Sequence, residues 1–101
     1  MADLLGLSAR YIDEGIYEWS CSVNRDTTEL SEISEDISVV EAFSHVVTFK
    51  TGDWLVLFDT SLEAFAGGIQ KNLRAWSDEP VNTIAFTHGH IDHISGAGTF
   101  V

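Results

Sequence analysis

Four side chains of the kinds that bind metal ions stand within six residues near the end of the sequence. They are His88, His90, Asp92 and His93. Neutral imidazole nitrogens and carboxylate oxygens are the ligands that suit zinc, iron and manganese in proteins. Chance assembly of exposed loop residues is the alternative, and it is disfavoured because histidine is uncommon. The pattern therefore predicts a metal site.

The residues around this cluster suit a metal-binding loop. Residues 81–86 are predicted to form a strand that runs directly into Thr87. In α/β sheets, ligands collect beyond the carboxyl ends of the strands. Gly89 removes a side chain between two candidate ligands, and Gly96 and Gly98 would let the backbone fold closely behind them. We also expect Ser95 to cap the helix that follows the cluster.

The elements that position the cluster are predicted from residue 37 onward. Strands are expected at residues 37–43, 45–50 and 54–58, the last of them apolar on both faces. The turn residues 51–53 make the last two strands a hairpin.

A helix should follow the hairpin. Thr60 and Glu63 fit a capping box, apolar residues recur at helical spacing, and Pro80 marks the end. Strand, helix and strand form a βαβ unit, whose two strands lie parallel. The sheet is therefore expected to be mixed.

The first 36 residues are less well defined. Residues 4–10 suggest a short helix, and the polar, acidic residues 24–36 are expected to be a solvated surface segment. We expect residues 1–101 to form one partial domain, in which residues 37–101 carry the hairpin, helix, strand and metal loop.

Composition excludes several classes of protein. Sixteen acidic residues against five basic ones give a formal net charge of -11, which disfavours nucleic acid and anionic membranes as partners. Cys21 is the only cysteine, so an intrachain disulfide is excluded. Neither a signal peptide nor an apolar stretch of about 18 residues is evident. A cytoplasmic protein is expected.

The metal motif resembles that of a known family. The pattern HxHxDH at residues 88–93, followed by Gly96, resembles the signature of the metallo-β-lactamase superfamily. The run LVLFDT, which contains Asp59, is similar to the family's first motif, an aspartate at a strand end. Together, VEAFSHVVTF, LVLFDTS and THGHIDHISGAG are most similar to the alkylsulfatase-like branch.

This resemblance implies an α/β fold and a dinuclear site. The chain would form the N-terminal half of an αββα sandwich. His88 and His90 would bind one metal ion, and Asp92 and His93 the other. Asp59 would hold the metal loop by hydrogen bonds. The ions would be zinc, with iron or manganese as alternatives, and a metal-bound water oriented by Asp92 would be the nucleophile.

The resemblance also shows what this sequence lacks. The family uses a further histidine for each metal and a bridging aspartate, all later in the chain, whereas this sequence stops eight residues after His93. His45 is expected in the core or lining a pocket. A single sheet should also expose an apolar face, for which the candidates are Phe43, Val47, Phe49, Leu55 and Leu57. A second copy, or the missing C-terminal half, would then be the partner.

Two functions follow as hypotheses. The first is a metal-dependent hydrolase of a small-molecule ester. A sulfate ester is the leading candidate substrate, and lactone, thioester and β-lactam substrates are alternatives. The alternative is a truncated or split, catalytically incomplete module that binds metal weakly or serves in association only.

Overall fold

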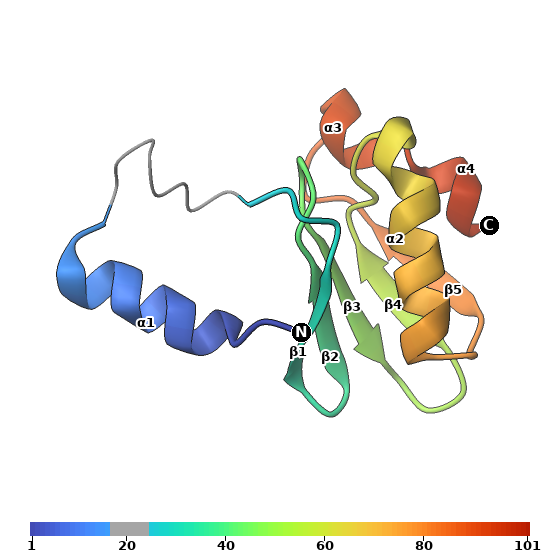
Figure 1. Cartoon of the computed structure of the whole chain (residues 1–101). Helices are drawn as coiled ribbons and strands as arrows, with labels where there is room; N and C mark the ends of the chain where they lie inside the picture. The colour runs from blue at the N-terminus through green and yellow to red at the C-terminus, as the bar shows by residue number, and fades with distance from the viewer. Residues whose placement is uncertain (17–24) are drawn as a thin grey trace.

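The computed structural model describes residues 1–16 and 25–101 (Figure 1). Cys21 and Asn24, the first residue of the segment expected to be solvated, lie outside the described residues. The elements in chain order are α1 (Leu4–Glu14), β1 (Leu30–Ser34), β2 (Ile37–Val40), β3 (Val46–Lys50), β4 (Leu55–Phe58), α2 (Glu63–Trp76), β5 (Val81–Ala85), α3 (Ile91–Ile94) and α4 (Ala97–Phe100).

The five strands form one mixed sheet in the order β1-β2-β3-β4-β5. The first four strands pair antiparallel in succession, and β4 pairs parallel with β5 across the α2 crossover. The predicted hairpin and βαβ unit are therefore confirmed. Figure 1 shows α2 on one side of the sheet and α1 on the opposite side.

The core lies between the sheet and α2. Strand side chains alternate between the two faces, so every second residue of β4 points towards the helix. Leu55 and Leu57 are fully buried there, while Phe58 is 40% exposed on the other face. The buried apolar residues are Leu30, Val40, Ala42, Val46, Leu55, Leu57, Ala66, Ile69, Leu73 and Phe100.

The prediction that Leu55 and Leu57 lie on the exposed apolar face of the sheet is therefore wrong. We call the face opposite α2 the open face. Leu55 and Leu57 pack against α2, and Val56 and Phe58 face the open side instead. The strand is apolar at all four positions, so its sequence does not reveal which alternate set faces the helix. The prediction for Phe43 holds, since this side chain is 51% exposed.

The start of α2 differs from the expected capping box. Leu62 is the N-cap residue and makes no side-chain bond to the helix. Instead, the backbone N–H of Glu63 donates to Oγ of Ser95, 3.0 Å away, and the Thr60 hydroxyl donates to the carbonyl oxygen of His93. Ser95 therefore caps α2 and not the helix that follows it. Both contacts join segments over thirty residues apart, so local spacing could not indicate them.

The interpretation of residues 24–36 as solvated surface is wrong for residues 30–34. These residues form β1, and Leu30 and Ser31 are buried. The acidic side chain of Glu32 is accommodated at the edge of the sheet, where its Oε1 accepts a 2.7 Å hydrogen bond from Trp76 Nε1. An edge strand with few apolar residues resembles a loop in composition alone.

The predicted N-terminal helix is present and extends to Glu14. The Asp3 side chain caps it by accepting from the N–H of Gly6, and Gly15 ends it in the left-handed conformation, with φ 62°. In the part of the chain that the structure describes, no helix is long and apolar enough to span a bilayer.

Candidate metal centre

The candidate site lies where β4 and β5 end side by side. Phe58, the last residue of β4, is paired in register with Ala85, the last residue of β5. Asp59 directly follows β4, and Thr87 lies two residues after the end of β5. The N–H of Asp59 donates to the carbonyl oxygen of Ala85 over 2.8 Å. The parallel pairing predicted from the βαβ pattern therefore brings the LVLFDT run beside the HxHxDH loop.

Asp59 is bound to the metal loop at both carboxylate oxygens. Its Oδ1 accepts from the N–H of Thr87 at 2.8 Å, and its Oδ2 accepts from the Thr87 hydroxyl at 2.6 Å. Oδ2 also lies 2.7 Å from Nδ1 of His93. The role that the family resemblance gives to Asp59 stays a prediction, but these contacts are the ones that such a role requires.

These contacts decide the charge of Asp59. Burial of the carboxylate by itself raises its pKa, but the hydrogen bonds from the Thr87 hydroxyl, the Thr87 N–H and His93 together outweigh burial and hold the pKa of Asp59 below its usual value. An ionised carboxylate only accepts hydrogen bonds. Nδ1 of His93 must then carry a proton, which in the neutral ring leaves Nε2 as the nitrogen with a free lone pair.

His93 is held at its backbone as well as at its ring. The N–H and the hydroxyl of Thr60 both donate to its carbonyl oxygen, at 2.8 and 2.9 Å. Ser44, from the connection between β2 and β3, places its Oγ 3.0 Å from Nδ1 of His93. Nε2 of His93 faces Oδ2 of Asp92 at 3.3 Å.

The other two histidines continue from this ring, His88 against His93 and His90 against His88. The centroids of His88 and His93 are 3.9 Å apart, and those of His88 and His90 are 4.5 Å apart. The structure therefore brings together all four residues predicted from the motif. His88 and His90 are exposed, whereas Asp92 and His93 are partly buried.

The donor atoms suit a metal in kind, and one donor distance is of the right size for two ligands of one ion. Two ligand atoms that each lie about 2.0–2.1 Å from one tetrahedral zinc are about 3.3 Å from each other. The 3.3 Å separation of His93 Nε2 from Asp92 Oδ2 matches that spacing, although an ion pair would give it too. Within residues 1–16 and 25–101, no three His, Cys, Asp or Glu side chains form a group that could hold a metal ion. The described residues fit part of a coordination shell.

A strained turn supports the metal loop from behind. Asp59 and Ser61 both adopt positive φ angles, 63° and 58°, which are unfavourable for residues other than glycine. The N–H of Gly96 donates to the Ser61 carbonyl at 3.1 Å, and a Cβ at Gly96 would overlap the Thr60 carbonyl oxygen. The close approach expected at Gly96 is thus present. The one expected at Gly98 is not, since a Cβ there would meet nothing within 4 Å.

An open pocket of about 420 Å³ adjoins these residues. Phe43 and Val47 contribute the apolar part of its lining. The polar lining comes from Asp59, Thr87, Asp92 and His93. His45 also lines this pocket, and its Nδ1 contacts the backbone N and O of Ala42 at 3.2 and 3.1 Å. The interpretation of His45 as pocket-lining is therefore confirmed.

Comparison with known proteins agrees with the motif. Residues 39–101 match the family model described as the metallo-beta-lactamase superfamily. A search of curated proteins finds no match.

Several solved structures are similar in fold. A metallo-β-lactamase with a HARLDQ motif from Cronobacter sakazakii aligns with a TM-score of 0.65 and 21% identity, covering 76% of this chain and 29% of that one. The inverting sec-alkylsulfatase Pisa1 from Pseudomonas sp. aligns with a TM-score of 0.66 and 22% identity, covering 73% of this chain and 12% of that one. A HARLDQ motif mutant of a metallo-β-lactamase from Cronobacter sakazakii aligns with a TM-score of 0.64 and 25% identity, covering 71% of this chain and 30% of that one.

These likenesses establish the arrangement of strands and helices. The observed mixed sheet corresponds to the half domain expected from the sequence. The chain spans less than a third of the length of each of these proteins.

Proposed function

Because the chain belongs to the metallo-β-lactamase superfamily, we propose that it carries one half of a metal-dependent hydrolase site. The observation that carries the proposal is the contact of Asp59 with Thr87 and His93, which joins the family's two motifs at one sheet edge. The order of the motifs along the chain adds support.

The four motif residues would bind metal in two pairs. His88 and His90 would contribute to one ion, and Asp92 and His93 to a second. Zinc is the expected metal, with iron or manganese as alternatives. When bound, the metal supplies an activated water and polarises the substrate oxygen.

Two further residues of the chain would keep the ligands in place. Asp59 fixes the proton of His93 on Nδ1, so Nε2 is available as a ligand atom. The Thr60 hydroxyl holds the His93 backbone. Asp92, which lines the open pocket, would also orient the attacking water.

The proposed substrate is a small-molecule ester. A sulfate ester is the leading choice, since one structural neighbour is named as a sec-alkylsulfatase and the sequence resembles that branch. The pocket supports an ester in general, because its lining combines the apolar side chains of Phe43 and Val47 with the polar side chains of Asp92 and His93.

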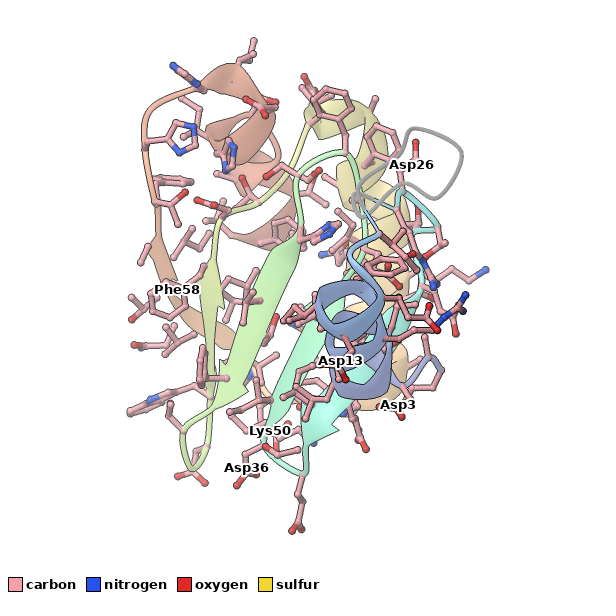
Figure 2. All side chains as sticks on the ribbon, turned by 90° about the vertical axis from the view of Figure 1, so that its left-hand side faces the viewer. Asp3, Asp13, Asp26, Asp36, Lys50 and Phe58 are labelled. Atoms are coloured by element: carbon pink, nitrogen blue, oxygen red, sulfur yellow. The ribbon has the colours of Figure 1, made fainter. Side chains whose placement is uncertain are left out.

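A second polypeptide, either another copy or the C-terminal half, would complete the site. Two candidate ligands for each ion fall short of the three that catalytic zinc sites use. The open face of the sheet also lacks a covering layer at Phe58, which is 40% exposed and which Figure 2 labels beside strands that α1 leaves uncovered. One partner could supply both the missing ligands and the covering layer.

The test is metal content per chain together with mass in solution. The purified protein should retain one or two zinc ions per assembled site, and the His88→Ala/His90→Ala variant should lose metal. His45→Ala is the matched control and should keep the wild-type content. Retention of full metal content by the double variant would refute the assignment.

A non-enzymatic role is the second candidate. It is favoured because no three donor side chains of the described residues form a group that could hold a metal ion. In that case the chain binds metal weakly or serves in association only. A folded monomer with no retained metal and no hydrolysis of esters would support this alternative over the hydrolase.

A further inference from the structure

The strained turn after β4 contacts His93 with two of its side chains and reaches it with the third through Ser44. Asp59 contacts the ring, and Thr60 contacts the carbonyl oxygen. The third side chain, Ser61, is fully buried, and its Oγ accepts a 3.4 Å hydrogen bond from the N–H of Ser44. The Ser44 hydroxyl lies 3.0 Å from Nδ1 of His93. The turn and the β2–β3 connection therefore hold one histidine together.

The Ser44 hydroxyl is buried beside the His93 ring. Ser44 is 6% exposed, and among residues 1–16 and 25–101 its hydroxyl contacts this ring nitrogen alone. Because Asp59 keeps the proton on Nδ1, the Ser44 oxygen is an acceptor in this contact. The Nδ1–H group is thus shared between two acceptors, Oδ2 of Asp59 at 2.7 Å and Oγ of Ser44 at 3.0 Å.

Two acceptors restrain an imidazole ring more than one acceptor does. The contact with Asp59 fixes the position of Nδ1 but leaves the ring able to tilt about that contact. A second acceptor from a different segment opposes the tilt, because the shared hydrogen bond lengthens as the ring turns away from Ser44. Ligand side chains need such support, since a working site tolerates only about 0.5 Å and 10–20° of displacement.

We propose that Ser44 is a positioning residue that fixes the plane of the His93 ring and so directs Nε2 towards the ion shared with Asp92. This inference deepens the proposed function and rests on it for the metal, whereas the contact between Ser44 and the ring does not depend on it. The positive φ of Ser61 is unfavourable and must be offset by surrounding contacts, of which its hydrogen bond with Ser44 is one.

The first measurement follows the His93 ring by NMR in the metal-free chain. Ser44→Ala removes the second acceptor and leaves the first, Asp59, in place. The Nδ1–H of His93 should then exchange with water about fivefold faster, as expected for the loss of one ordinary hydrogen bond. The ring should keep its proton on Nδ1, because the contact with Asp59 remains.

Two further variants separate positioning from a general loss of stability. Ser38→Ala is the matched control, because Ser38 is fully buried and its Oγ has no hydrogen-bond partner among the described residues. It should leave the exchange of the His93 ring unchanged. Ser44→Thr keeps the hydroxyl and should restore the slow exchange. Denaturant unfolding of all three variants shows whether each is folded under the conditions of the measurement.

Zinc affinity is the second readout, measured by competition with a chromophoric chelator. Ser44→Ala should lower the affinity about tenfold, which is the smaller end of the effect typical for loss of a partner of a ligating histidine. Ser38→Ala should keep the wild-type affinity, and Ser44→Thr should recover it.

Two results would overturn the inference. Unchanged exchange of the His93 ring in Ser44→Ala would show that the hydroxyl does not restrain the ring. Faster exchange with unchanged zinc affinity would show that the restraint does not support metal binding. Failure of the proposed function would look different: neither wild type nor any variant would bind zinc, while faster exchange in Ser44→Ala would still show that Ser44 holds the ring.

Discussion

Oδ2 of Asp59 lies 2.7 Å from Nδ1 of His93, although 34 residues separate the two in sequence. This contact joins the end of β4 to the short helix α3 that carries the last candidate ligand. It fixes which ring nitrogen of His93 faces Asp92, and so connects the fold of the βαβ unit to the chemistry of the metal loop.

Replacement of Asp59 by Asn should impair metal binding through His93. The amide can donate to Nδ1, which favours the ring tautomer with its proton on Nε2 and removes the ligand lone pair. Zinc affinity should fall about 10- to 100-fold, as is typical when the partner of a ligating histidine is lost. Competition with a chromophoric chelator measures the affinity, and ¹⁵N shifts of the imidazole report the tautomer in the metal-free chain.

The control for this substitution is Asp53→Asn, which alters an exposed carboxylate in the hairpin turn. It should leave both readouts at their wild-type values. An Asp59→Asn protein with unchanged tautomer and unchanged zinc affinity would show that Asp59 does not act through His93.

The lowered pKa of Asp59 predicts a pH dependence of stability in the metal-free chain. The unfolded chain takes up this proton near the ordinary aspartate pKa of about 3.9, and the folded chain only at lower pH. The stabilisation is therefore present above pH ~4 and is lost as the pH falls through the folded-state pKa. Denaturant unfolding at several pH values should show a steeper acid loss for wild type than for Asp59→Asn. Parallel curves would contradict the prediction.

Much of the fold could be predicted from local patterns, whereas the contacts that hold the metal loop in place could not. The hairpin and the βαβ unit follow from turn residues and periodicity, and the metal motif is contiguous. Ser44 and Thr60 contact His93 from 49 and 33 residues away, so no local spacing reveals them. Positive φ at Asp59 and Ser61 is likewise imposed by tertiary contacts and not by residue type.

The sequence also does not show which alternate residues of β4 face α2. A strand that is apolar at every position gives no alternation, so Leu57 and Phe58 are equivalent until α2 is placed on one side. By contrast, the sequence does not predict β1, because Glu32 and its serine neighbours give this edge strand the composition of a polar loop. Both errors arise where burial is decided by a neighbouring element.

Gly96→Ala should destabilise the loop that carries His93. The added Cβ would overlap the Thr60 carbonyl oxygen, which is backbone and cannot move without disturbing the hydrogen bonds to His93. We expect a loss of about 1–3 kcal/mol in the free energy of unfolding, as is typical of overpacking. Denaturant unfolding monitored by tryptophan fluorescence provides the value. Gly98→Ala, which meets open space, should be neutral within about 0.5 kcal/mol, and an equal loss in both variants would contradict the steric argument.

Thr48→Val should stabilise the protein. Thr48 is fully buried beside α2, and its Oγ1 finds no hydrogen-bond partner among the described residues. Burial of an unsatisfied hydroxyl is costly, so replacing it by a methyl group of similar shape should raise the free energy of unfolding by about 1 kcal/mol. Thr83→Val, at an exposed position of β5, is the matched control and should change it much less. Destabilisation by Thr48→Val would instead reveal a bound water or a shared hydrogen bond with Ser38, its register partner in β2, whose Oγ is also unpaired.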